Sequence, residues 1–291
     1  MCALMHALGY SQTASGTHPD DAVRLESVSN YSRGLLYKSQ KEYRTAISYF
    51  EKALEEKSEL YRVYFHLAEC YYRLNDVKKT EYYASLSVGE KRDFIPSHML
   101  LYNARMKSKD YPGAADVLQT MLRADPTNSK AHFLSGQLFM NRLGDDEKAA
   151  KHFERLLELS KEHSIEQFYG EYAHYYLGYI SYKKGNHEKA VYHLKETVNL
   201  NEQNRPARAM LIDILMANYL LDDAINNIES YFKLFSENAK MHAYLGRIYY
   251  LRNDIKAVAH LRKASEQMNY DGLLSKALLM ELSGQGHNAV G

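Results

Sequence analysis

A pattern of small and large apolar residues recurs along the chain about every 34 residues, and this recurrence constrains the fold more than any other sequence feature. One half of each interval carries alanine followed by apolar or small residues four and seven positions later, as in Ala46, Phe50 and Ala53. The alanine recurs at Ala114, Ala149, Ala190, Ala224 and Ala257. The other half carries its own small or apolar set, at Gly34, Leu67-Ala68, Leu101, Gly136, Leu177-Gly178, Leu211 and Leu245-Gly246. Spacings of three and four residues predict amphipathic helices, so each interval predicts two.

The segments between the two halves of an interval are polar, as expected for short turns. They read "SQKEY", "LNDV", "SKDY", "KKGN" and "LRND", which suit helix caps and tight connections. Glycine inside a helix costs about 1 kcal/mol relative to alanine. We therefore expect Gly34, Gly136, Gly178 and Gly246 to lie where two helices approach closely. A single hairpin cannot bury its apolar face alone, so successive hairpins must stack.

The period and these residue types resemble the tetratricopeptide repeat, a helix-turn-helix unit. Seven copies can be assigned, at 27–60, 61–94, 95–128, 129–163, 171–204, 205–238 and 239–271. The fourth copy has one extra residue near "GDD", and the second departs most, with Thr80 and Ala84 at the small and aromatic positions. The resemblance implies an all-α fold: a right-handed α-solenoid in which the first helix of each repeat, helix A, lines the concave side and packs against its second helix, helix B.

The segments outside the seven copies are assigned to the ends and to one insertion. We expect residues 1–26 to form an N-terminal tail with a capping helix, and residues 272–291 to form a C-terminal capping helix and tail. The leucines of "DGLLSKALLMELSG" either cap the last repeat or join a partner chain, which would make a homo-oligomer. Residues 164–170 are surplus to the period, and either lengthen a helix or form a loop where the array bends. We expect one cooperative array.

Composition excludes several classes of protein. Lysine plus arginine number 37 against 36 aspartate plus glutamate, and this balance argues against a dedicated nucleic-acid binder. No apolar run approaches the roughly 20 residues that cross a bilayer. Cys2 and Cys70 are the two cysteines, too few for a disulfide framework. We expect a cytoplasmic protein. The alternative is a periplasmic or membrane-anchored lipoprotein, if Cys2 is the mature N-terminus of a chain that has lost its leader.

The resemblance also implies a binding surface, because members of this family bind ligands mainly through helix A positions 2, 5, 9, 12 and 13. The partner-binding residues assigned in this way are Tyr31, Lys38, Phe65, Tyr72, Arg73, Asn103, Lys107, Phe133, Asn141, Tyr172, Tyr175, Tyr179, Tyr182, Lys183, Arg247 and Tyr250. The basic residues at these positions are Lys38, Arg62, Arg73, Lys107, Lys130, Lys183, Lys240 and Arg247, against Glu69 and Asp213. A basic, tyrosine-rich groove suits an extended or helical peptide that carries acidic groups.

Nothing in the sequence predicts catalysis, a metal or a cofactor. Thirteen histidines are present, but none forms an H-E-x-x-H pair, and His98, His132 and His242 recur at helix A position 4, where a packing role explains them. Phosphate loops and nucleophile elbows are absent from the sequence. The leading hypothesis is therefore a non-enzymatic scaffold or adaptor. The alternatives are an envelope or pilus assembly factor of bacteria, and a regulatory arm of a separate enzyme.

Overall fold

The computed structural model describes residues 29–56, 59–162, 167–266 and 269–288, and this part of the chain contains fifteen α-helices and no strand. The residues expected to form the N-terminal tail, 1–26, lie outside it. The helices before Pro126 are α3 (Asn30–Ser39), α4 (Tyr43–Ala53), α5 (Leu60–Arg73), α6 (Val77–Glu90), α7 (Ile95–Ser108) and α8 (Tyr111–Ala124). The helices after Pro126 are α9 (Ser129–Leu138), α10 (Asp146–Glu162), α11 (Gln167–Lys183), α12 (His187–Leu200), α13 (Arg205–Ala217), α14 (Leu221–Leu234), α15 (Ala239–Leu251), α16 (Lys256–Ser265) and α17 (Tyr270–Asn288).

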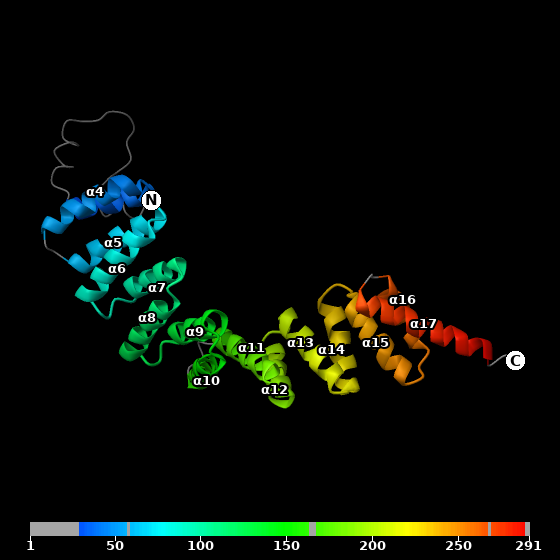
Figure 1. The fold of residues 1–291 in the computed structure, drawn as a ribbon. Helices are drawn as coiled ribbons and strands as arrows, with labels where there is room; N and C mark the ends of the chain where they lie inside the picture. Colours follow the sequence, from blue (N-terminus) through cyan, green and yellow to red (C-terminus); the bar gives the residue numbers. More distant parts are fainter. Residues whose placement is uncertain (1–28, 57–58, 163–166, 267–268, 289–291) are drawn as a thin grey trace, which may run out of the picture. The chain divides into compact units, whose positions relative to one another are not determined.

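The chain divides into two compact units, unit 1 up to Pro126 and unit 2 from Thr127. Within each unit, each helix packs against the next one along the chain (Figure 1). Unit 1 contains the first three hairpins, α3–α4, α5–α6 and α7–α8. Unit 2 contains the other four, α9–α10, α11–α12, α13–α14 and α15–α16. The expected all-α solenoid of helical hairpins is confirmed.

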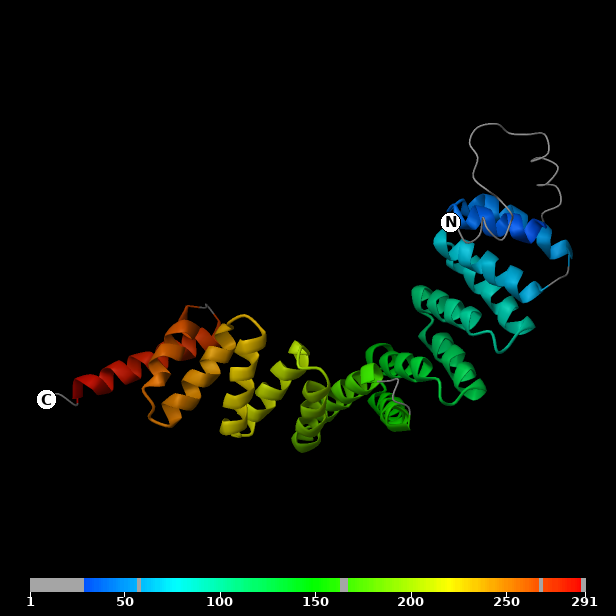
Figure 2. The same cartoon turned by 180° about the vertical axis from the view of Figure 1, so that it is seen from behind.

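Two irregular segments of the sequence have local explanations in unit 2. The extra residue of the fourth repeat is absorbed by η2, a π-helical turn at Phe139–Leu143 that follows α9 directly. A π-turn holds one residue more than an α-turn, so it accommodates the insertion without breaking the helix. Within the surplus segment 164–170, residues 167–170 form the start of α11 and lengthen helix A of the fifth hairpin. At the C-terminal end, α17 packs on α15 and α16 (Figure 2).

The predicted helix glycines lie where large side chains of helix B cross helix A. A Cβ atom added to Gly136 would stand 2.6 Å from the ring of Phe153, and one added to Gly34 would stand 2.5 Å from the ring of Phe50. Both rings are completely buried. Leucine takes the place of the ring opposite Gly178 and Gly246. Each glycine is therefore required because a methyl group would overlap the partner side chain.

The second repeat departs from this pattern in a way that follows the same geometry. Ala68 stands at its glycine position and Ala84 at its aromatic position, and both are completely buried. A larger residue on helix A is thus matched by a smaller residue on helix B.

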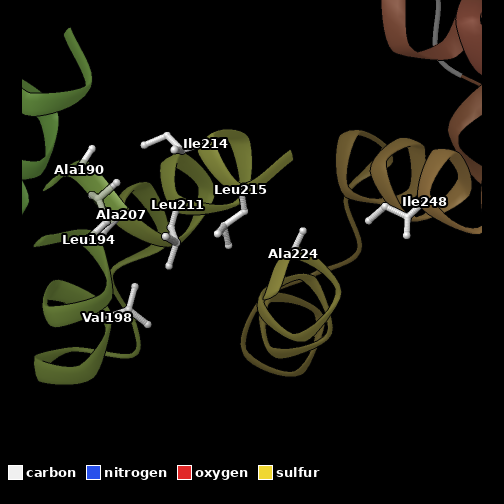
Figure 3. Close-up of a cluster of buried hydrophobic side chains, with 9 residues drawn as sticks. All are labelled: Ala190, Leu194, Val198, Ala207, Leu211, Ile214, Leu215, Ala224 and Ile248. Carbon is white, nitrogen blue, oxygen red and sulfur yellow. The ribbon is translucent and has the colours of Figure 1, made fainter. Parts of the chain in front are cut away.

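The core is continuous from one hairpin to the next within unit 2. Ala190, Leu194 and Val198 of α12 meet Ala207, Leu211, Ile214 and Leu215 of α13, and the cluster extends to Ala224 of α14 and Ile248 of α15 (Figure 3). Because helix B of one repeat and helix A of the next share this cluster, neighbouring hairpins stabilise each other.

All seven turns between helix A and helix B contain one residue with positive φ. The residues are Lys41, Asn75, Lys109, Gly144, Gly185, Tyr219 and Asn253. Glycine and asparagine adopt this conformation readily, whereas tyrosine does so at a cost. Tyr219 has φ 57° and a side chain that is 78% exposed, so little packing offsets this strain.

We expect Tyr219→Asn to raise the free energy of unfolding of unit 2 by about 1 kcal/mol, because asparagine relieves the strain at positive φ. Urea unfolding of the full chain measures this change as a higher transition midpoint. Tyr192→Asn is the matched control, since Tyr192 is also exposed but lies inside α12. A lower midpoint for Tyr219→Asn than for the unaltered chain would contradict the argument.

Candidate functional site

The sixteen predicted partner-binding residues fall into two groups, one in each unit. We call the surface formed by α3, α5 and α7 the unit 1 A face, and the surface formed by α9, α11, α13 and α15 the unit 2 A face. Tyr31, Lys38, Phe65, Tyr72, Arg73, Asn103 and Lys107 belong to the unit 1 A face. Phe133, Asn141, Tyr172, Tyr175, Tyr179, Tyr182, Lys183, Arg247 and Tyr250 belong to unit 2, with Asn141 in η2. Their role in binding stays a prediction.

An ion pair joins the first two helices of the unit 1 A face. Lys38 Nζ on α3 donates to Glu69 Oε2 on α5 at 2.6 Å, and His66 Nδ1 lies 3.3 Å from the same oxygen. The hydrogen bond with His66 and the charge of Lys38 hold the pKa of Glu69 at about 2, against the opposing effect of burial. Burial lowers the pKa of His66, although Glu69 opposes this shift. Lys38 is therefore already neutralised by a neighbouring carboxylate.

Aromatic side chains fill the rest of this face. The Tyr31 ring lies 6.0 Å from Phe50 and 5.7 Å from His66, between ring centres. Phe65 makes an edge-to-face contact with Phe94 at 5.4 Å. Lys107 Nζ lies 5.2 Å from the centre of the Tyr72 ring, a cation–π distance. Tyr31 and Phe65 are thus partly used in packing, and Lys107 and Arg73 remain exposed.

The unit 2 A face is built on a cluster of packed rings from α9, α10 and α11. The ring of Phe133 lies 5.5 Å from that of Tyr172 and 6.4 Å from that of Tyr176. Tyr176 stacks on the buried ring of Phe153 at 4.8 Å, and its hydroxyl accepts a hydrogen bond from Gln137 Nε2 at 2.9 Å. Ring packing and this hydrogen bond fix the orientation of α11 relative to α9.

The four tyrosines predicted to form one stripe on α11 differ in exposure. Tyr172 and Tyr175 are half-buried, and Tyr175 packs against the core cluster shared by α12 and α13. Tyr179 and Tyr182 are 38% and 43% exposed. The exposed part of the stripe therefore consists of two rings rather than four.

Acidic residues neutralise part of the predicted positive charge. Lys183 Nζ donates to Asp146 Oδ2 at 2.7 Å, and Lys240 donates to Asp213 at 2.9 Å. Arg62 is held by Glu59 at 3.2 Å. With the Lys38–Glu69 and Arg62–Glu59 pairs, four of the eight predicted cations lie beside a carboxylate. Within the described residues, Arg73, Lys107, Lys130 and Arg247 have no such ion pair. The positive charge open to a ligand is therefore smaller than the eight predicted cations indicate.

Tyr250 is tied to the C-terminal helix. A hydrogen bond with Glu281 of α17 is the main cause that raises the pKa of its hydroxyl. A tyrosine held by the capping helix can still stack with a ligand, but its hydroxyl is already used.

Sequence reasoning missed an exposed apolar edge at the helix A to helix B turns of the sixth and seventh hairpins. Tyr219, Leu220, Leu251 and Ile255 are 78%, 47%, 61% and 84% exposed. The prediction used helix A positions mainly, whereas three of these residues lie in turns. The signal available in the sequence was the pair Tyr219-Leu220, which occupies a turn that is polar in the other repeats.

Metal-binding and thiol chemistry have no evident site among the described residues of the two faces. Across the residues that the structure describes, no three histidine, cysteine or acidic side chains are placed to hold a metal ion. Burial raises the pKa of the Cys70 thiol to about 12, so this cysteine is not a thiolate at neutral pH. No described helix combines the length and the apolar character needed to cross a membrane.

Comparisons with known proteins agree with this architecture. Two family models, both described as tetratricopeptide repeat, match residues 28–59 and 100–164. Similar solved structures include a tetratricopeptide repeat protein from Parabacteroides merdae, with 15% identity and a TM-score of 0.53 over 86% of this chain and 96% of that one. Another is YrrB, a TPR protein with an unusual peptide-binding site, with 21% identity and a TM-score of 0.54 over 67% of this chain and 97% of that one. The comparison with curated proteins found no match.

Stacked helical hairpins with small-to-large contacts between paired helices define an α-helical repeat protein. The seven hairpins share the period of the tetratricopeptide repeat, and its family models match the chain at residues 28–59 and 100–164: these parts of the chain are tetratricopeptide repeats. Proteins with this fold generally mediate protein–protein interactions and are typically non-catalytic.

Proposed function

We propose that the chain is a non-enzymatic scaffold that binds a segment of a partner protein on the unit 2 A face. The observation that carries the proposal is the exposure of two rings of α11, Tyr179 and Tyr182, the second of which stacks on His187 with ring centres 6.0 Å apart. Exposed tyrosines offer large contact area and a hydroxyl at a low cost in side-chain entropy.

The packed ring cluster supports this role because it preorganises α11. Tyr172 and Tyr176 hold α11 against Phe133 of α9, and Tyr175 holds it against the next hairpin. A partner that stacks on Tyr179 and Tyr182 would therefore not have to order the helix that presents them. Binding to a fixed surface avoids part of the entropy lost on association.

The charges favour a partner segment with a few acidic groups. Arg247 and Lys130 can pair with carboxylates, while Lys183 is shared with Asp146. With few cations available, binding should weaken only modestly as salt increases. The similarity to YrrB, described as having a peptide-binding site, is consistent with a peptide ligand. We propose the unit 1 A face, with exposed Arg73 and Lys107, as a second contact surface.

Affinity capture tests the proposal. The intact chain, the Tyr179→Ala/Tyr182→Ala variant and the Tyr192→Ala variant are immobilised and exposed to extract from the source cells. We expect the double variant to capture at least about ten-fold less of a specific prey than the intact chain, because truncating a hot-spot tyrosine costs about 2 kcal/mol or more. Tyr192 is the control because it is 58% exposed but lies on a helix B. Loss of the prey from the Tyr192 variant alone would reject the unit 2 A face.

A further inference from the structure

Three of the four hairpins in unit 2 contain the same contact between two histidines. The Nδ1 atoms lie 3.1 Å apart in His132–His152, 3.0 Å apart in His174–His193 and 2.9 Å apart in His242–His260. In each pair, one histidine lies on helix A and the other on helix B. The corresponding positions in unit 1 hold Asn30 with Tyr49, Tyr64 with Tyr83, and His98 with Val117.

This geometry restricts how many protons each pair can hold. Two nitrogens at 3 Å require that one donates a hydrogen and the other accepts it. A pair can therefore be neutral or carry one extra proton, but two imidazolium rings would place two N–H groups against each other. The unfolded chain has no such restriction, and each histidine there titrates near pH 6.5.

Apolar surroundings further disfavour charge on the pairs. His193 and His242 are only 5% and 4% exposed. His152 stacks on Phe139, and His260 stacks on Tyr249. Transfer of a charged ring into such a place is unfavourable unless an anion compensates it.

The charged groups around the first two pairs add to this effect. Burial is the larger cause, and the facing His132 the smaller one, that lowers the pKa of His152 to about 4. The pKa of His193 is also lowered to about 4. Burial is the largest cause, and His174 and Lys189 contribute less.

The third pair differs because an acid faces it. Burial lowers the pKa of His242 and of His260, and Lys263 acts on both rings in the same direction. The facing His242 and Lys256 also lower the pKa of His260. Glu237 opposes these shifts, with its Oε2 atom 3.5 Å from His242 Nε2. The third pair should therefore accept a proton more readily than its burial alone would allow.

We propose that the histidine pairs make unit 2 an acid-sensitive array, in which protonation separates helix A from helix B in the paired hairpins. The sign follows from linkage. Below pH 6.5 the histidines of the unfolded chain bind protons that the folded pairs do not bind. The contribution of the pairs to the free energy of unfolding is therefore fully present above pH 6.5 and is lost as the pH falls towards 4. This inference does not depend on the proposed binding function.

Hydrogen exchange of the full chain, measured by mass spectrometry at pH 7.5 and pH 5 and corrected for intrinsic rates, tests the proposal. A histidine whose pKa falls from 6.5 to about 4 should reduce protection about 30-fold at pH 5. We expect this loss in α9 to α12, while α7 and α8, whose His98 bonds to the Arg92 carbonyl oxygen instead, serve as the internal reference. Equal pH dependence in the two regions would overturn the proposal.

A second experiment separates the pairs from general acid effects. The His152→Asn and His193→Asn variants keep an amide near the Nδ1 position and cannot be protonated, so each should lose most of the pH dependence of its own hairpin. His187→Asn is the control, since His187 bonds to Asn218 rather than to another histidine. Ring-carbon NMR of the unaltered chain gives a readout independent of variant folding. Titration of all histidine rings near pH 6.5 would contradict the proposal.

Discussion

Phe153→Ala is expected to lower the free energy of unfolding of unit 2 by about 3–5 kcal/mol, the largest effect we predict for a single substitution. The Phe153 ring is completely buried between α9 and α10 and stacks on Tyr176. Its removal leaves a cavity that Gly136 of α9, which has no side chain, cannot fill. Chemical unfolding of the full chain, followed by circular dichroism, measures the loss.

The partner residue makes this prediction more specific. Gly136→Ala should lower the free energy of unfolding by up to about 2 kcal/mol, because the new methyl group would stand 2.6 Å from the Phe153 ring, an overlap that costs about 1–3 kcal/mol. The roughly 1 kcal/mol that alanine gains over glycine inside a helix offsets part of this cost. Gly170→Ala is the matched control in the same unit, where an added Cβ would make ordinary contacts at 3.5 Å or more. We expect that variant to be unchanged or slightly more stable.

The double variant Gly136→Ala/Phe153→Ala reproduces the Ala68 and Ala84 pair of the second repeat. Because removal of the Phe153 ring makes room for the methyl group at position 136, the double variant should cost at least about 1 kcal/mol less than the sum of the single variants. Additive costs would show that positions 136 and 153 affect stability independently, and would contradict the contact seen in the structure.

Glu69→Ala is expected to lower the free energy of unfolding of unit 1 by about 2 kcal/mol at pH 7, because it leaves the Lys38 ammonium partly buried without its carboxylate. The side chains of Lys38 and Glu69 are 21% and 30% exposed, so solvent screens the pair only in part. Glu158→Ala removes a pair with Arg155 in which the glutamate is 62% exposed, and should change stability by less than about 0.5 kcal/mol. Equal effects of the two substitutions would reject a special role for Glu69.

The Glu69 prediction also fixes a pH dependence. The pKa of Glu69 is about 2 in the folded chain, below the ordinary glutamate value. Its stabilising contribution is therefore fully present above about pH 4.5 and disappears as the pH falls to about 2. The difference in unfolding free energy between the unaltered chain and the Glu69→Ala variant should shrink over that range. A difference that stays constant down to pH 2 would contradict the assignment.

The repeating helices could be predicted from the sequence because their determinants are local. Gly34, Gly136, Gly178 and Gly246 recur at one position of the period, and the structure shows the large side chain that each one faces. The π-turn at Phe139–Leu143 corresponds to an insertion that the period had revealed. What could not be predicted depends on pairs far apart in sequence. Lys38 and Glu69 are 31 residues apart, and no local pattern shows that one neutralises the other.

The candidate site was predicted by position but not by exposure. Helix A positions identified Tyr172, Tyr175, Tyr179 and Tyr182 equally, and the exposure of each depends on how the next hairpin packs. The histidine pairs escaped notice for a similar reason. Their members lie on different helices, 18 to 20 residues apart, so a search for ligand spacing within one helix does not find them.

Photo-crosslinking from single positions is the most direct test of the claim that the unit 2 A face binds a partner. A photoreactive phenylalanine analogue replaces Tyr179 in one variant and Tyr192 in another, and both variants are irradiated in extract from the source cells. The analogue at position 179 should form a covalent product with a specific protein, and the analogue at position 192, although more exposed, should not. A product formed from position 192 and absent from position 179 would contradict the account.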